Sequence, residues 1–245
     1  MNIALIGYGK MGQIIERFAI ERGHEIVLKI SIDNAEDLTA ANLKKADVAI
    51  DFSTPDTVIN NIYACFDANV PLVVGTTGWY GELQKIKDEC VSRNNTLLYG
   101  SNFSIGVNLF FHLNEVLAKV MNNYPAYEVQ VEEIHHTHKL DSPSGTAITI
   151  AEGVIDNLER KAEWVNELDG NLSDEVIKQE QLLIASQRIG EVPGTHSVIY
   201  SSEVDDIEIK HTAHSRAGFA LGAVVAAEWL QHKQGFYNIA DIFNF

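Results

Sequence analysis

The stretch Gly7-Tyr8-Gly9-Lys10-Met11-Gly12 decides the fold of the first part of the chain. It follows a short apolar run, Ile3 to Ile6, and leads into the amphipathic segment Ile14 to Arg22. In a G-x-G-x-x-G pattern the first glycine permits a tight turn, the second lets the backbone approach a pyrophosphate, and the third allows close helix-to-strand packing. The N–H groups that begin the following helix face the bound anion. We therefore expect all six residues to bind a dinucleotide, with a purely structural glycine turn as the alternative.

Beyond this loop, short apolar runs alternate with longer amphipathic segments such as Val58 to Ala68. The runs expected to form strands are Ile3 to Ile6, Ile26 to Ile30, Val48 to Phe52, Leu72 to Val74 and Leu97 to Tyr99. Alternation of this kind predicts a parallel sheet with helices on both faces. The fold class is therefore α/β, beginning with a Rossmann-like nucleotide domain.

Asp33 lies about twenty residues beyond the glycine loop, just after the second expected strand. A carboxylate at this place accepts hydrogen bonds from the ribose hydroxyls of the adenosine and disfavours a 2′-phosphate. NADH is therefore favoured as the cofactor. NADPH stays possible, because Lys10 or Lys29 could compensate, and a plain turn-capping role for Asp33 is also open.

Two further loops follow strands at the same edge of the expected sheet, which is where ligands of open α/β sheets bind. One contains Gly75, Thr76 and Thr77, and the other is Gly100-Ser101-Asn102-Phe103. Small residues there would let a nicotinamide approach the backbone, so both loops are expected to contact the cofactor. Ordinary turn chemistry is the alternative for each.

The pattern changes after the long helix expected over Ser104 to Asn123, whose apolar residues form one stripe. The later strands alternate inward and outward residues and predict an α+β domain with an open mixed sheet, largely antiparallel. They are Glu128 to Ile134, His196 to Ser201 and Glu203 to His211. The acidic segment Glu159 to Glu180 is expected to form surface helix and loop, and the apolar segment Gly218 to Leu230 to pack on the first domain. The expected division is residues 1–104 with 217–245 for the dinucleotide and 105–216 for substrate binding and oligomerisation.

The composition excludes several classes of function. Of 245 residues, 18 are basic and 34 acidic, which gives a net charge of −16 and a field that repels nucleic acid and anionic membranes. No apolar run is long enough to span a bilayer, and no export signal begins the chain. Only Cys65 and Cys90 are present, which fits a reducing compartment. We expect a soluble, cytoplasmic protein without a nucleic-acid or membrane partner.

One segment opposes this negative field. Glu133 to Ala147 brings together three histidines and a lysine within five residues, His135 to Lys139. An imidazole that protonates near neutral pH beside an ammonium group supplies both substrate charge and a proton. Ser144-Gly145-Thr146 then precedes a second helix, whose N-terminal N–H groups would hold a carboxylate. Zinc binding and solvated surface polarity are the alternatives, and no metal is expected because adjacent histidines on a strand diverge and no cysteine lies nearby.

Taken together, these segments resemble the dihydrodipicolinate reductases of lysine biosynthesis, also called 4-hydroxy-tetrahydrodipicolinate reductases. The resemblance spans nearly the whole chain, and its most specific part is the H-H-x-H-K-x-D-x-P-S-G-T pattern that begins at His135. The other matching motifs are the loop Gly7 to Gly12, Asp51-Phe52-Ser53, Val74 to Gly78 and Asn102 to Asn108. The family implies hydride transfer from NAD(P)H to a cyclic imine dicarboxylate in the diaminopimelate pathway, and a homotetramer.

The resemblance also implies roles for single residues. His135 matches the proton donor, Lys139 a lysine that donates or positions the proton, and His136 a substrate contact. Gly145 and Thr146 match the carboxylate-binding pair, with Ser144 beside them. The chain departs from the family in having Lys10 where an arginine is common and Asn34 after the ribose carboxylate. Three other functions stay open from the residues alone: a dehydrogenase of another small acid, a nucleotide-responsive regulatory module and a zinc hydrolase.

Overall fold

The computed structural model describes residues 1–170 and 177–243, and it divides into two compact units. Unit 1 comprises Met1–Ile105 and Ala217–Phe245, and unit 2 comprises Gly106–Arg216. Each unit has an apolar core of its own, as the buried clusters below show.

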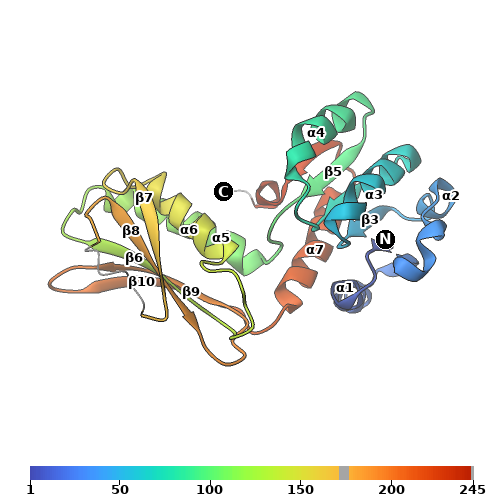
Figure 1. The fold of residues 1–245 in the computed structure, drawn as a ribbon. Helices are drawn as coiled ribbons and strands as arrows, with labels where there is room; N and C mark the ends of the chain where they lie inside the picture. The colour runs from blue at the N-terminus through green and yellow to red at the C-terminus, as the bar shows by residue number, and fades with distance from the viewer. Residues whose placement is uncertain (171–176, 244–245) are drawn as a thin grey trace. The chain divides into compact units, whose positions relative to one another are not determined.

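Unit 1 is built on a six-stranded parallel sheet with the strand order β11-β5-β4-β3-β1-β2 (Figure 1). Its strands are β1 (Asn2–Ile6), β2 (Glu25–Ile30), β3 (Val48–Asp51), β4 (Leu72–Val74), β5 (Thr96–Tyr99) and β11 (Gly235–Asn238). Its helices are α1 (Lys10–Glu21), α2 (Ala40–Leu43), α3 (Pro55–Ala68), α4 (Leu83–Ser92) and α7 (Ala217–Leu230), with short 3₁₀ helices η1 (Ile32–Asp37), η2 (Tyr80–Glu82) and η3 (Ile239–Ile242). The expected strands and the Rossmann-like sheet are confirmed.

Both faces of this sheet are buried, as runs without polar alternation predict. On one face, alternate residues of β1 and β3 such as Ala4 and Ala49 join side chains of α3 and α4 in one apolar cluster. On the other face, Ile3 and Leu5 pack with α1 and with the alanine-rich helix α7. The expected return of the segment after Gly218 to the first sheet is therefore confirmed.

This topology gathers the chemistry-bearing loops of unit 1. The strand order reverses at β1, which pairs with β2 on one side and β3 on the other. Ligands of open parallel sheets bind beyond the carboxyl ends of the strands at such a reversal. The loops that follow β1, β3, β4 and β5 all begin at that edge.

Unit 2 is a five-stranded mixed sheet with the order β10-β9-β6-β8-β7, covered on one face by α5 and α6 (Figure 1). Its elements are α5 (Ile105–Met121), β6 (Glu128–His135), α6 (Gly145–Ile155), β7 (Glu163–Leu168), β8 (Gln181–Arg188), β9 (Thr195–Ser201) and β10 (Asp206–Thr212). The mixed sheet is confirmed, but the expectation that it is largely antiparallel is wrong. β6 pairs with β8 and β8 with β7 in parallel, while only the β6–β9 and β9–β10 pairs are antiparallel.

The expectation of surface helix and loop over Glu159 to Glu180 is wrong where the structure describes this segment. β7 forms an edge strand, and all its residues stay at least partly accessible. Its acidic and amide side chains lack the apolar alternation that marks a half-buried strand. The sequence of this edge strand therefore does not predict a strand. Residues 171–176 lie outside the described part of the chain.

The expected long helix is α5, but its apolar stripe does not form the core. Four of its members have between 42% and 55% of their surface exposed, and they are Leu109, Leu113, Val116 and Val120. Phe110, Ala118 and Met121, on another side of the helix, pack on the sheet instead. Within the described residues, no helix combines the length and apolar character needed to cross a bilayer.

Candidate active site

The glycine loop of unit 1 forms the turn that its sequence predicts. Gly7 has a φ of 87°, and a Cβ at this position would lie 2.2 Å from the carbonyl oxygen of Phe52, so only glycine fits. A Cβ on Gly12 would lie 2.8 Å from the carbonyl oxygen of Gly7, which is the close packing expected of the third glycine. By contrast, nothing lies within 4 Å of a Cβ built on Gly9. The loop backbone is thus open at the position where a pyrophosphate is expected, directly before α1.

The side chains of the loop differ in their surroundings. Lys10 is exposed at the first turn of α1, and Met11 is partly buried. The Tyr8 hydroxyl donates to Glu16, and the ammonium group of Lys29 lies 2.5 Å from the Glu16 carboxylate and 4.9 Å from the centre of the Tyr8 ring. Lys29 is therefore already paired, which weakens it as a partner for a 2′-phosphate.

Asp33 is exposed in η1, three residues beyond the end of β2. Its backbone N–H donates to the Ser31 hydroxyl at 3.2 Å, and Ser31 caps this short helix together with Asn34. The carboxylate is thereby presented at the edge of the sheet where a ribose is expected.

Asp51, at the end of β3, joins two loops of this edge. Its buried carboxylate accepts hydrogen bonds from Thr76 (2.5 Å), Asn61 (2.8 Å) and Ser53 (2.9 Å). Burial raises the pKa of this carboxyl, while the donors around it act in the opposite direction. The Thr76 hydroxyl also accepts from the Ser53 N–H at 2.8 Å, so it serves the two loops, whereas Thr77 is exposed.

The loop glycines beyond β4 and β5 have packing roles. A Cβ on Gly75 would overlap the Phe52 ring at 2.2 Å, and one on Gly100 would lie 2.7 Å from Ile239. Packing therefore suffices to explain both glycines, so approach of a nicotinamide to them stays a prediction. Phe103 is buried with its ring edge-to-face on Phe52, while Ser101 is exposed and Asn102 accepts from the Ser104 N–H.

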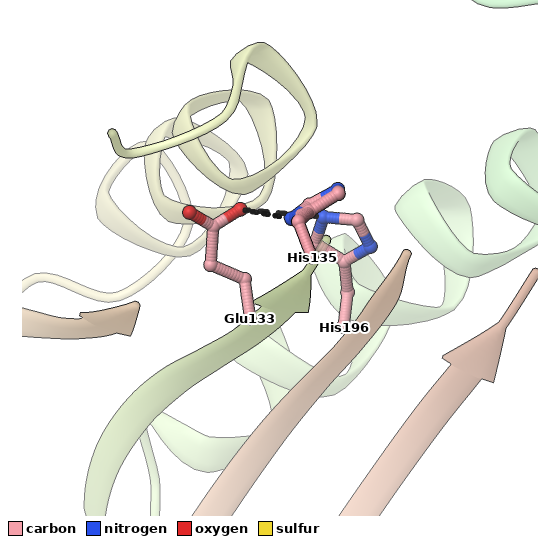
Figure 2. A group of neighbouring side chains, drawn as sticks. All are labelled: Glu133, His135 and His196. Atoms are coloured by element: carbon pink, nitrogen blue, oxygen red, sulfur yellow. Dashed lines mark ion pairs between the residues drawn. The ribbon is translucent and has the colours of Figure 1, made fainter. Parts of the chain in front are cut away.

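In unit 2, β6 carries a histidine and a carboxylate on one face. Glu133 and His135 are two residues apart on the strand and both are buried. Figure 2 shows them with His196 of the neighbouring strand β9. Nδ1 of His135 lies 3.2 Å from Oε2 of Glu133, and Nε2 of His196 lies 3.7 Å from the same oxygen. His135 therefore stands beside a buried anion.

Two pKa values are shifted in this cluster. Burial alone opposes ionisation of Glu133, but the donors around its carboxylate outweigh burial and hold its pKa well below the ordinary value. Burial, with the neighbouring imidazole of His135 as a second cause, lowers the pKa of His196 to about 4. At neutral pH the cluster thus contains an ionised carboxylate and a neutral His196.

The other expected residues of this segment follow β6. The ammonium group of Lys139 lies 2.7 Å from the nearer carboxylate oxygen of Asp141, and this pairing lowers the pKa of Asp141. His136 is partly buried, and His138 is exposed beside Glu191. The lysine charge is therefore held on the same turn as the histidines.

The start of α6 completes this group. Ser144 is its N-cap, and its hydroxyl accepts from the Ala147 N–H at 3.1 Å and lies 3.2 Å from Nε2 of His196. Gly145 is exposed and Thr146 partly buried in the first turn, whose N–H groups have no partner within a helix. Through Ser144, the helix N-terminus expected to hold a carboxylate is joined to the histidine cluster.

The ligand atoms of Glu133, His135 and His196 lie within 4.8 Å of one another, a spacing that a metal ion could bridge. Arg188 already lies 3.3 Å from Oε1 of Glu133, and the Ser144 hydroxyl contacts His196. These protein partners favour charge pairing within the cluster over a divalent cation. The absence of a functional metal stays a prediction.

Sequence reasoning assigned no role to Glu133, Arg188 or His196. A signal was present for the first, because Val129, Val131, Glu133 and His135 alternate toward one face, where an ionised side chain needs a partner. Arg188 and His196 become neighbours only through pairing of β8 and β9 with β6.

A parallel-sheet unit with a dinucleotide loop and a second unit with a histidine–lysine site are typical of an oxidoreductase that uses a nicotinamide nucleotide. The model of the N-terminus of dihydrodipicolinate reductase matches residues 1–103, and the model of its C-terminus matches residues 106–243. The chain therefore belongs to the dihydrodipicolinate reductase family, whose members are NAD(P)H-dependent oxidoreductases of lysine and diaminopimelate biosynthesis. The resemblance seen in the sequence is confirmed, and so is the activity that it implied.

Individual proteins with this activity are similar to the chain over most of its length. The chain is 47% identical over 244 residues to the 4-hydroxy-tetrahydrodipicolinate reductase of Christiangramia forsetii, with 99% of this chain and 97% of the relative covered. It is 32% identical over 229 residues to that of Neisseria gonorrhoeae, covering 93% and 83%. Among solved structures, a dipicolinate-bound dihydrodipicolinate reductase from a Paenisporosarcina species is similar with a TM-score of 0.79, 21% identity and 99% of both chains covered. That structure shows the shared fold.

Proposed function

We propose that unit 1 binds NAD(P)H and unit 2 binds 4-hydroxy-tetrahydrodipicolinate, and that His135 supplies the proton that accompanies reduction of the ring. The observation that carries this proposal is the 3.2 Å approach of Nδ1 of His135 to the buried carboxylate of Glu133, directly beside the N-terminus of α6. The Paenisporosarcina relative binds dipicolinate, a dicarboxylate, which supports a dicarboxylate as the substrate here.

The open backbone at Gly9 and the N-terminus of α1 fit the pyrophosphate of a dinucleotide. Loss of the 4-hydroxyl group as water would give the conjugated ring, to which the reduced nicotinamide, when bound, would supply a hydride. The loops after β3, β4 and β5 position the nicotinamide end, and Asp51 holds two of these loops together. Asp33 accepts from the ribose hydroxyls.

His135 then donates its proton to the enamine carbon or nitrogen that the hydride leaves electron-rich. The N–H groups of Gly145 and Thr146 bind one substrate carboxylate at the positive end of α6. Lys139 neutralises carboxylate charge and assists the proton transfer, and His136 contacts the substrate. Together these groups neutralise the charge of the substrate and fix its orientation. In a cofactor-dependent reaction, these are the contributions of the protein.

For the cofactor, we propose a preference for NADH. Asp33 disfavours a 2′-phosphate, and Glu16 already neutralises Lys29. Lys10 is the exposed cation of the loop and would account for a residual use of NADPH.

We further propose a cytoplasmic homotetramer that assembles through unit 2. In the described residues, helices cover one face of its sheet, and the apolar side chains Leu183 and Ile199 point away from that cluster and stay partly exposed. An apolar sheet face of this kind needs a cover. Light scattering coupled to size-exclusion chromatography tests the mass, and a monomer would contradict the assembly.

The decisive experiment couples the condensation of pyruvate with aspartate semialdehyde to the purified chain, and follows NADH and NADPH oxidation separately. We expect turnover with both, faster with NADH. His135→Gln should lower kcat by about two to four orders of magnitude, with a smaller effect on KM. His138→Gln, an exposed histidine of the same turn, is the matched control. Normal turnover of His135→Gln would remove His135 as the proton donor.

A further inference from the structure

The carboxylate of Glu133 is held in one orientation by its first oxygen. Oε1 accepts from the Ser144 N–H (3.1 Å) and the Ser186 hydroxyl (2.8 Å), and Arg188 donates to it at 3.3 Å. These three donors come from the N-cap of α6 and from β8, so the side chain is fixed from two sides. A buried carboxylate with an arginine and two further donors is retained in its ionised form.

The second oxygen has a different environment. Oε2 and Nδ1 of His135 are both buried, and within the described residues neither makes a regular hydrogen bond. It faces two imidazole nitrogens, Nδ1 of His135 at 3.2 Å and Nε2 of His196 at 3.7 Å (Figure 2). Oε2 of Glu133 thus faces two imidazoles, each of which has a nitrogen able to donate a hydrogen bond to it.

The hydroxyl of Ser144 distinguishes these two imidazoles. Its oxygen accepts from the Ala147 N–H at 3.1 Å and lies 3.2 Å from Nε2 of His196, closer than the 3.7 Å between this nitrogen and Oε2. Burial lowers the pKa of His196 to about 4, so this imidazole is neutral at neutral pH and carries no charge to pair with Glu133. Oε2 is therefore left to act on the nearer nitrogen, Nδ1 of His135.

We infer that Glu133 is a positioning residue for His135: its Oε2 accepts from the Nδ1–H, stabilises the protonated imidazole and directs the Nε2–H toward the substrate. This inference rests on the proposed role of His135 as the proton donor. The proposed function uses Glu133 only as the buried anion beside His135 and gives it no role in the reaction. The arrangement follows the general logic of a carboxylate that orients a histidine through its Nδ1.

The test is a double-mutant cycle between Glu133→Gln and His135→Gln. Glutamine keeps the size of the side chain and removes its charge. We expect Glu133→Gln alone to lower kcat at least about 10-fold while the substrate KM changes less than about 3-fold, because the N-terminus of α6 and Lys139 still hold the substrate carboxylates. In the His135→Gln background, Glu133→Gln should lower kcat less than about 2-fold, because the residue through which Glu133 acts is absent.

Two further variants support the interpretation of the double-mutant cycle. Glu132→Gln alters the neighbouring glutamate, which points to the other face of β6, and it should leave kcat near the wild-type value. If Glu133→Gln folds poorly in thermal melts, Ser186→Ala replaces it, since this variant removes one donor to Oε1 and leaves the charge. Ser186→Ala should lower kcat by a few-fold in the wild-type background. In the His135→Gln background it should leave kcat unchanged.

The outcomes separate this inference from the proposed function. An unchanged kcat in Glu133→Gln, or equal losses in both backgrounds, overturns the positioning role while His135 stays the donor. Full turnover of His135→Gln overturns the donor role itself, whatever Glu133→Gln shows.

Discussion

The hydroxyl of Thr76 donates a 2.5 Å hydrogen bond to the buried carboxylate of Asp51 and so joins the loop after β4 to the end of β3. Asp51 accepts in addition from Asn61 and Ser53, and thereby holds both loops at the edge of the sheet where the dinucleotide is expected. The carboxylate is an acceptor for every donor that approaches it, which an amide cannot be.

Asp51→Asn should therefore loosen both loops. The asparagine presents an NH₂ group to at least one donor, and a lost buried hydrogen bond costs about 1–3 kcal/mol of the free energy of unfolding. We expect a several-fold weaker NADH affinity, measured by fluorescence titration, and a lower midpoint in urea. Asp88→Asn, on the exposed side of α4, is the control and should change neither. Unaltered NADH binding in a destabilised Asp51→Asn would show that the network supports the fold and not the cofactor loops.

Glu16→Gln should shift the cofactor preference toward NADPH. The change keeps a partner for Tyr8 but removes the charge that neutralises Lys29, whose ammonium group then becomes available to a 2′-phosphate. We expect the ratio of kcat/KM for NADPH to that for NADH to rise by about 5- to 10-fold, the range of one added charge interaction. Glu21→Gln on the same helix, which pairs with Arg17, should leave the ratio as it is. A constant ratio in both variants would exclude Lys29 from cofactor selection.

The acid stability of unit 2 should depend on His196. Its folded pKa of about 4 lies below the ordinary value of 6.5, so the folded state resists a proton that the unfolded state binds. The stability that this confers is present above the unfolded pKa and is lost as the pH falls toward the folded one. Between about pH 6.5 and about pH 5, where Glu133 stays ionised in both states, the loss should approach about 2 kcal/mol.

Urea unfolding of the wild type and of His196→Asn over this pH range measures the contribution as a difference between the two proteins. The asparagine variant should show a flatter decline of the free energy of unfolding with falling pH. His138→Asn, whose side chain is 77% exposed, should decline as the wild type does. Parallel curves for all three proteins would mean that His196 titrates normally.

Most of unit 1 could be predicted because its central strands are apolar runs buried on both faces, such as Leu72 to Val74, and because the glycine loop imposes its own geometry. The edge strand β11 was not predicted, since its residues are only partly buried and form no apolar run. β7 was missed because an exposed edge strand has no apolar pattern of its own. The partners of Glu133 could not be predicted either, since Ser186 and Arg188 lie 53 and 55 residues further along the chain and approach only when β8 pairs with β6. Motifs located the proposed proton donor, whereas tertiary pairing decided what surrounds it.

Gly194 is the last position that bears on the donor, because its Cα lies close to Nε2 of the His135 ring. A Cβ at this position would lie 3.1 Å from Nε2 of His135, and the φ of 154° is one that side chains rarely adopt. Gly194→Ala should therefore push the ring away from the substrate and lower kcat by about 10-fold or more, at a cost of about 1–3 kcal/mol in stability. Gly190→Ala provides the matched control, since φ is also positive there but nothing lies within 4 Å of the added Cβ. It should cost stability and leave kcat near normal, so an equal loss of kcat in both variants would trace the effect to backbone strain and not to crowding of His135.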